Sequence, residues 1–305
     1  MPSSLFTEEQ LNRVSNIVVE QEFPEYQMAS GNILNVSQAY GAGVDTYSFD
    51  ILTKVGQAAV IANGAEDIPQ VNAYTERRYG KFYTIANSYS YTIQDLEHAQ
   101  FAGLNLNAQM AISSREIMES KFDEISWFGD DQYDLEGIVD YPNVPTEVAP
   151  DGNTGSSEWD TKTPAEIYQD LRKLAGDMRN ATKGKYFPST YIMGQKQFDI
   201  ISETPYPDNQ GEETILSFFL KTQRLTPTGV QEVFPAPRLE NAFAGGVNGI
   251  IGFTRRPDRQ QIMLGMDYTQ EPPQLENLTY KVIARMRVGG VIIYRPYSVR
   301  QLTGI

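Results

Sequence analysis

The sequence predicts an α+β fold, and three observations lead to this class. Helical and strand-like patterns follow one another in a mixed order, without the regular alternation of an α/β protein. One amphipathic helical pattern is unusually long, and the chain after it is rich in strand-like segments. With 305 residues and 40% hydrophobic content, the chain is large enough to bury a substantial core.

The N-terminal part is expected to form one helix and then two strands. Residues 7–20 begin with a T-E-E-Q capping sequence and carry apolar residues at helical spacing, which predicts a short amphipathic helix. Residues 46–52 and 81–93 alternate apolar and polar side chains, as half-buried strands do. We expect these two strands to pair with each other across a long polar excursion that cannot be stable alone.

A long helix over residues 92–128 is the strongest single prediction. Thr92 and Asp95 have the spacing of a capping box, and a bend is expected at Gly103. At ~1.5 Å per residue the helix would be about 55 Å long. Its end, Trp127-Phe128, favours packing across a sheet over a coiled coil. One face carries residues at alternating steps of four and three, namely Leu104, Ala108, Ala111, Arg115, Met118, Phe122 and Ile125.

The C-terminal half is expected to contain two helices and six strands. Thr163-Pro164-Ala165-Glu166 is a helix start, and the buried stripe that follows is Ile167, Leu171, Leu174 and Met178. A second helix is predicted over residues 212–222. The strands are predicted at residues 189–193, 230–234, 249–254, 260–266, 279–288 and 290–299. Arg256-Pro257-Asp258-Arg259 has the composition of a hairpin turn between two of them.

An acidic stretch at residues 129–145 is the most conspicuous local feature, with carboxylates at Asp130, Asp131, Asp134, Glu136 and Asp140. An EF-hand loop starting at Asp130 would place Leu135 where glycine is needed and Tyr141 where a bidentate glutamate is needed. A glycosidase pair would need two carboxylates on rigid elements. We interpret the stretch as a connector; the alternatives are an adventitious cation site and an acid-dependent hydrolase using Asp130, Asp131, Asp134 or Glu136.

Charge is unevenly distributed along the chain. The net charge is −14, which argues against a nucleic-acid reader. Residues 129–160 hold nine acidic residues and no basic one, whereas residues 279–305 hold five basic residues and no acidic one, and residues 1–30 hold five Glu against Arg13. These blocks are either solvated surface or complementary surfaces between copies of the chain.

Most catalytic chemistry is absent from the sequence. There is no cysteine and His98 is the single histidine, which excludes thiolate sites and His-rich metal sites. Neither GxxxxGK[ST] nor GxGxxG occurs. We therefore expect no catalytic residue, no cofactor-binding residue and no metal site. The N-terminus lacks signal-peptide features, and the apolar runs are much shorter than the roughly 20 residues of a membrane span.

Several segments in a fixed order resemble the major capsid proteins of tailed bacteriophages with the HK97-type fold. They are GQAAVIANGAEDIPQVN (residues 56–72), YTIQDLEHAQFAGLNL, WFGD, GIVDYPNVP, TPAEI, FPSTYIMG and the closing RVGGVIIYRPYSVRQLTGI. The resemblance covers residues 41–305. It implies an N-terminal arm (1–44), an extended loop (45–90), a peripheral domain with the spine helix (91–162), an axial domain (163–266) and C-terminal strands returning to the peripheral domain (267–305).

The same resemblance implies a structural function. The chain would self-assemble, as hexamers and pentamers, into an icosahedral shell around double-stranded DNA, in the virion, after assembly in the host cytoplasm. Portal, scaffold and decoration proteins would be further partners, the DNA would be enclosed without sequence-specific contact, and no membrane would be involved. The alternative is the shell of an encapsulin-like cellular nanocompartment, which uses the same fold.

Overall fold

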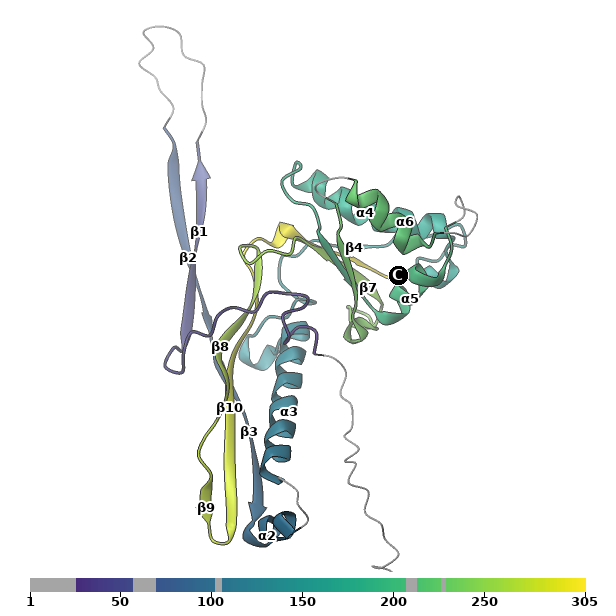
Figure 1. The fold of residues 1–305 in the computed structure, drawn as a ribbon. Helices are drawn as coiled ribbons and strands as arrows, with labels where there is room; N and C mark the ends of the chain where they lie inside the picture. The colour runs from purple at the N-terminus through teal and green to yellow at the C-terminus, as the bar shows by residue number, and fades with distance from the viewer. Residues whose placement is uncertain (1–25, 57–69, 102–105, 207–212, 226–228) are drawn as a thin grey trace, which may run out of the picture.

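The chain forms three parts that are distinct in space (Figure 1). They are a two-stranded ribbon, a long sheet with a helix along it, and a compact lobe beside them. The computed structural model describes residues 26–56, 70–101, 106–206, 213–225 and 229–305. The helix expected over residues 7–20 lies outside these residues. The mixture of helices and sheets is the predicted α+β class.

The ribbon consists of β1 (Thr46–Val55) and β2 (Asn72–Lys81), paired antiparallel. The expected pairing of residues 46–52 with residues 81–93 is therefore wrong. β1 pairs with β2, the next strand along the chain. In this pairing Asp50 lies directly opposite Arg77 and forms an ion pair with it at 2.7 Å. Residues 81–93 supply a different strand, β3 (Tyr83–Thr92), which joins the long sheet.

The long sheet has the strand order β3-β10-β8. Besides β3 it contains β8 (Gln260–Gln270) and β10 (Thr279–Ile293), and the short strand β9 (Gln274–Glu276) pairs with β10. β10 is one strand of 15 residues, so the two separate strands predicted at 279–288 and 290–299 are wrong. Gly289 and Gly290 do not end the strand. They make a bulge where the pairing with β8 shifts register, and Gly290 has a φ of +71°.

The predicted spine helix is described as two segments, α2 (Ile93–Phe101) and α3 (Leu106–Phe128). Gly103 lies outside the described residues. α3 is about 35 Å long at ~1.5 Å per residue, shorter than the single 55 Å helix expected, and α2 runs in a different direction (Figure 1). α3 contacts β3, β10 and β8, which confirms a helix lying across a sheet.

The predicted buried face of this helix is correct only near its end. Met118, Phe122 and Ile125 are buried. Arg115 instead points to solvent and pairs with Glu119 at 2.7 Å, Ala108 is exposed, and Leu104 is not described. Ser114 is buried in place of Arg115, and its hydroxyl donates to Asn87 Oδ1 on β3 at 2.8 Å.

The compact lobe is a five-stranded sheet, order β4-β11-β7-β5-β6, with helices against it. Its strands are β4 (Thr146–Val148), β5 (Thr190–Met193), β6 (Glu232–Pro235), β7 (Gly249–Phe253) and β11 (Val299–Thr303). Its helices are α4 (Pro164–Ala181), α5 (Gln195–Glu203) and α6 (Ile215–Arg224). Short 3-10 turns lie directly after α3, at Asp131–Tyr133, and further along the chain at Trp159–Thr161, Pro237–Leu239 and Pro296–Ser298. The predicted stripe of α4 is buried as expected, whereas α5 was not predicted.

One further expectation is wrong in an informative way. Arg256-Pro257-Asp258-Arg259 does form a turn, with Arg259 N donating to Arg256 O at 3.0 Å. It is not a hairpin, because β7 before it and β8 after it belong to different sheets. The turn therefore carries the chain from the compact lobe to the long sheet.

Each part of the body has its own apolar core. One core includes Met28, Phe122 and Trp127, lies between α3, the long sheet and the start of the described chain, and extends onto the five-stranded sheet through Ile192 and Ile251. A second lies between α4, α6 and the five-stranded sheet, and includes Trp159 and Phe219. None of the helices within the described residues is long and apolar enough to cross a membrane.

Candidate interaction surfaces

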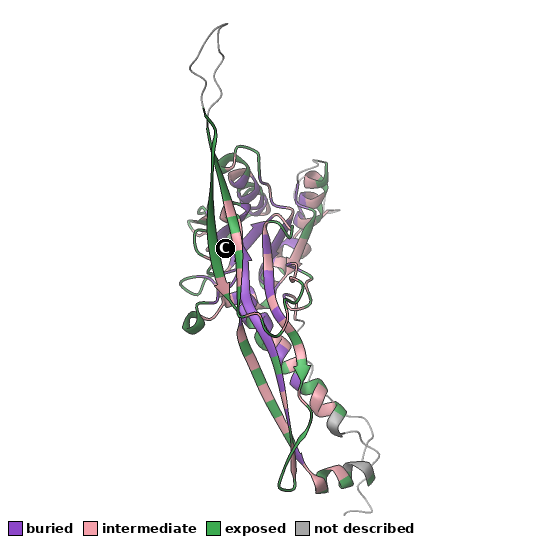
Figure 2. Cartoon of the chain, turned by 90° about the vertical axis from the view of Figure 1, so that its left-hand side faces the viewer, coloured by how far each residue is buried: buried purple, intermediate pink, exposed green. Residues whose placement is uncertain are grey.

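The ribbon presents most of its surface to solvent. Every side chain of β2 is exposed apart from the partly buried position Gly80, and β1 is exposed from Leu52 onward. Figure 2 shows the outer ribbon in the exposed colour along both strands. The exposed apolar side chains on and next to it are Leu52, Val55, Val71, Tyr74 and Tyr79. A two-stranded hairpin is marginally stable in water, so this surface is suited to contact with a partner.

The root of the ribbon is fixed to the long sheet by aromatic contacts. The rings of Tyr47 and Phe82 lie 4.9 Å apart, and Phe49 meets Tyr294 edge-on at 5.1 Å. Phe82 is buried and packs closely against Gly289 and Gly265, where an added Cβ would come within 2.9 Å of its ring. These glycines therefore make room for the aromatic anchor.

Arg287 ties the same root to the sheet by polar contacts. Its side chain, on β10, donates to Ala42 O at 2.6 Å and to Asp45 Oδ1 at 2.5 Å. The Arg287 residue is 9% exposed. The Asp45 side chain is 84% exposed, so its ion pair adds little. The hydrogen bond from the Arg287 guanidinium to Ala42 O contributes about 1.5–3 kcal/mol and holds the chain just before β1.

Replacing Arg287 with alanine is expected to loosen the ribbon root. Amide hydrogen exchange in residues 40–50 should become faster, because the free energy of local opening there falls by about 1.5–3 kcal/mol. Exchange in residues 190–193 should stay unchanged. Arg285→Ala is the matched control, because Arg285 lies on the same strand and pairs with Glu271 at 2.7 Å in an exposed setting, where the loss should stay below about 1 kcal/mol. Equal exchange in both variants would contradict the anchoring role.

The acidic loop, residues 129–140, leaves α3 through a tight backbone turn. Gly129 has a φ of +74° and its N donates to Ile125 O at 2.8 Å, so this glycine ends α3 in the left-handed conformation typical of helix C-termini. Asp130 and Leu135 exchange two backbone hydrogen bonds, of 2.8 and 3.1 Å. Asp130 Oδ1 also accepts from Gln132 N at 3.1 Å. The loop is thus held in a defined shape by its own backbone.

The carboxylates of this loop lie in different surroundings. Within the described residues, no group of three or more His, Cys, Asp or Glu side chains could hold a metal ion. Asp134 and Glu136 line an open hollow of about 450 Å³ at the ribbon root, which Asp130 and Asp131 do not line. Burial, then repulsion from the neighbouring aspartates, raises the pKa of Glu136. Burial and Asp131 raise the pKa of Asp140.

The basic C-terminal block is largely neutralised within its own chain. Arg285 pairs with Glu271, Arg287 with Asp45, and Arg300 with Glu147. The last pair joins the basic block to the acidic block of residues 129–160 inside one molecule. Arg295 forms no ion pair in the part of the chain that the structure describes. The block as a whole is therefore not the continuous free surface that the sequence suggested.

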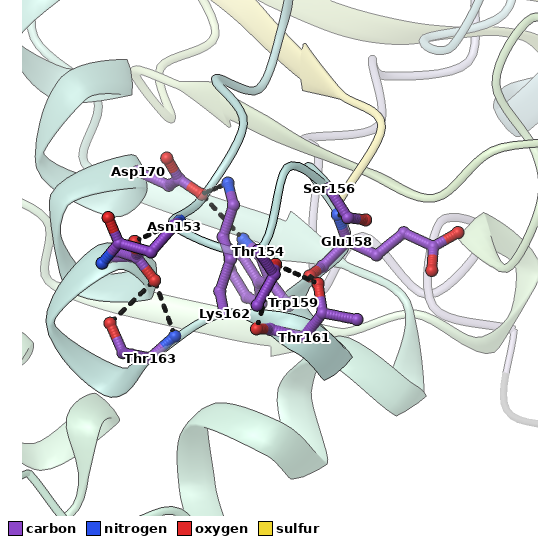
Figure 3. A network of polar contacts seen from close by, with 10 residues as sticks. Asn153, Thr154, Ser156, Glu158, Trp159, Thr161, Lys162, Thr163 and Asp170 are labelled. Carbon is purple, nitrogen blue, oxygen red and sulfur yellow. Dashed lines mark hydrogen bonds and ion pairs between the residues drawn. The ribbon is translucent and has the colours of Figure 1, made fainter.

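The compact lobe contains a buried charged network (Figure 3). Asp170 Oδ2 accepts from Lys162 Nζ at 2.6 Å and from Trp159 Nε1 at 3.0 Å. The Lys162 and Asp170 side chains are 1% and 3% exposed. Beside them Glu166 accepts from Thr163 N at 2.8 Å, closing the capping box of α4. This network fixes the loop before α4 to the helix, with the Lys162–Asp170 pair closed off from solvent.

His98 lies exposed in the last turn of α2. It is far along the chain from the acidic loop and forms no metal group within the described residues. The features that sequence reasoning missed are the second ribbon strand and the Arg287 anchor. The sequence of β2, NAYTERRYGK, has no alternation of apolar and polar side chains that could have indicated the strand. No local signal could have paired Arg287 with Asp45.

Comparisons with known proteins agree with this architecture. The sequence profile of a family described as "Major capsid protein" matches residues 56–305. The capsid of Myoviridae phage XM1 is similar in structure, with a TM-score of 0.82, 17% identity and full coverage of both chains. A structure from Mycobacterium phage Bobi is also similar, with a TM-score of 0.60, 14% identity and coverage of 96% of this chain and 94% of that one. No curated protein matches the sequence.

A virus-like particle from Pyrococcus furiosus also shares the fold, with a TM-score of 0.56, 16% identity and coverage of 89% of this chain and 90% of that one. These structural likenesses confirm the HK97-type fold expected from the sequence.

Proposed function

The chain belongs to the major capsid protein family, and from this premise we propose how its copies build a shell. It is a structural protein of the virion capsid and not an enzyme, and its copies self-assemble. The encapsulin-like alternative is not favoured by this family membership. In our proposal the copies form hexamers and pentamers of an icosahedral shell that encloses double-stranded DNA without sequence-specific contact. Assembly takes place in the host cytoplasm.

The observation that carries this proposal is the exposed ribbon. Its two strands present Leu52, Tyr74 and Tyr79 to solvent, each with more than half of its surface exposed. A neighbouring copy that covers these side chains would remove their apolar surface from water and stabilise the paired strands. The ribbon is then the extended loop of the proposed assembly. Portal, scaffold and decoration proteins would add to this self-contact.

We keep the division proposed from the sequence, with an arm (1–44), an extended loop (45–90), a peripheral domain (91–162), an axial domain (163–266) and returning strands (267–305). Sheet membership supports the axial domain in part, because β5, β6 and β7 lie within its range. β4 and β11 belong to the same sheet but lie outside residues 163–266, whereas β8 begins within that range and belongs to the long sheet. We therefore propose an axial domain that also recruits these two outer strands.

Shortening the ribbon is expected to abolish shell formation while the body stays folded. Phe49 and Arg78 are directly opposed, so an Asn-Gly turn can replace residues 50–77 and close the hairpin at its root. Purified full-length protein should give particles of uniform diameter by electron microscopy. The shortened variant should give none at the same concentration, with an unchanged thermal melting profile of the body.

Two results would contradict the proposal. Full-length protein that stays monomeric by light scattering across a range of salt and protein concentrations would contradict the self-assembly of this chain alone. Normal particles from the shortened variant would contradict the role of the ribbon but not the shell function itself.

A further inference from the structure

Cationic side chains from three separate segments converge on one aromatic ring, that of Tyr186. The Arg259 guanidinium lies 4.5 Å from the ring centroid and the Lys185 ammonium 5.6 Å from it. Arg295 Nη1 lies 3.4 Å from the Tyr186 hydroxyl. We call Lys185, Arg259 and Arg295 around Tyr186 the Tyr186 cluster. Cations attracted to a ring face are held in place by it, so the cluster is a fixed basic surface.

The Tyr186 cluster is incompletely neutralised. Arg259 pairs with Asp258 at 3.3 Å. Among the residues that the structure describes, Lys185 and Arg295 form no ion pair, and both are exposed. Burial alone would raise the pKa of Tyr186, but Arg295 and Arg259 outweigh it and lower that pKa. The positive field of this surface is thus strong enough to act on the buried ring.

The acidic loop has the complementary property. Asp131, Asp134 and Asp140 are exposed, and none of them has a cationic partner within the described ranges. The loop's backbone hydrogen bonds fix their positions. The raised pKa of Glu136 reflects in part the repulsion among these carboxylates, and a cationic partner would relieve that repulsion.

We propose that the acidic loop of one copy docks on the Tyr186 cluster of the next copy. This inference rests on the proposed self-assembly and specifies one contact within it. The two surfaces differ and lie on separate elements, so their contact is heterologous; repeated heterologous contacts form a ring when the rotation between neighbouring copies closes, as it would in a hexamer or pentamer. Complementary charge of this kind sets partner orientation and register. A polyanion such as DNA is a less favourable occupant, because the chain as a whole carries a charge of −14.

Charge reversal on each side tests the contact. The acidic variant is Lys185→Glu with Arg295→Glu, both at exposed positions. The basic variant is Asp131→Lys with Asp140→Lys; Asp134 is left in place because its φ of +56° disfavours lysine. Assembly of each variant is measured by sedimentation velocity against protein concentration. Each variant alone should need at least tenfold more protein than wild type to assemble.

Mixing the two variants separates a contact between copies from a folding defect. In an alternating ring, every reversed loop would face a reversed cluster, so an equimolar mixture should form even-numbered rings, such as hexamers, within about threefold of the protein concentration at which wild type assembles. The alternation closes only rings with an even number of copies. Asp151→Lys with Lys281→Glu is the control for reversing exposed charges elsewhere at unchanged net charge, since both residues are exposed and lie outside the two surfaces; it should assemble like wild type.

Four outcomes have defined meanings. Wild-type protein that does not assemble would contradict the proposed function itself. Wild-type assembly together with normal assembly of both variants would overturn only this contact. Loss of assembly in both variants without recovery in the mixture would show that the two surfaces do not meet each other. Binding of a short DNA duplex by wild type, lost in the acidic variant with normal assembly, would assign the cluster to phosphate and overturn the proposal.

Discussion

Replacing Asp170 with alanine is expected to lower the free energy of unfolding by about 3–5 kcal/mol. Asp170 accepts hydrogen bonds from Lys162 and Trp159 inside the compact lobe. The substitution leaves the Lys162 ammonium, 1% exposed, without a partner and away from water. Urea denaturation of the unassembled protein, followed by tryptophan fluorescence, measures the loss.

Two further variants make this prediction specific. Lys196→Ala removes the pair with Asp160, whose side chains are 58% and 46% exposed, and should cost less than about 1 kcal/mol. Lys162→Met combined with Asp170→Leu removes both charges and should restore part of the stability, because no desolvated ion remains, although Trp159 Nε1 still loses its acceptor. A loss in Asp170→Ala as small as that in Lys196→Ala would contradict the buried-pair argument.

Gly129→Ala is expected to destabilise the exit from α3 by about 3 kcal/mol, the upper end of the cost of a strained backbone position. A Cβ at Gly129 would lie 2.2 Å from Leu135 O and 2.8 Å from Gly137 N, both backbone atoms that cannot turn away. The φ of +74° adds a steric cost for any L side chain. Thermal unfolding of the unassembled variant measures the change.

Gly176 provides the matched control. It lies in the interior of α4, and an added Cβ there would meet nothing within 4 Å. Alanine has a higher helix propensity than glycine, so Gly176→Ala should stabilise by about 0.5–1 kcal/mol. Shifts of the same sign in the two variants would show that the contacts around Gly129 do not determine its identity.

The helix starts could be predicted from the sequence because their partners are three residues apart. Asp95 N donates to Thr92 Oγ1 at 3.1 Å, and Thr163 N donates to Glu166 Oε2 at 2.8 Å. Such contacts form within one turn and depend little on the rest of the chain. The same applies to the αL position that ends α3.

Strand partners could not be predicted in this way. Alternation identifies a strand and its buried face but not the strand beside it, and β1 was accordingly assigned to the wrong neighbour. The break predicted within β10 has a similar origin. Gly289 and Gly290 have the composition of a turn, but they are required by the Phe82 ring and by the approach of Glu136 O to within 2.8 Å of a Gly290 Cβ.

The interaction surfaces show the same limit. The acidic loop is contiguous in sequence and was identified as a charge block. The Tyr186 cluster takes one residue from each of three distant segments, so only the folded chain brings it together. The C-terminal arginines are one basic block in the sequence, but long-range partners, Asp45 and Glu147, neutralise Arg287 and Arg300 in the folded chain.

The short passage from the ribbon to the body has a mechanical consequence. β2 ends at Lys81 and β3 begins at Tyr83, so Phe82 is the one residue between them, and its N donates to Asp45 O at 2.9 Å. Because only one residue separates the two strands, a force applied to the ribbon is transmitted directly to β3. The ladder between β3 and β10 takes that load in shear, and β10 passes it toward β11 in the lobe. Force on the ribbon is thus expected to reach the compact lobe through the long sheet.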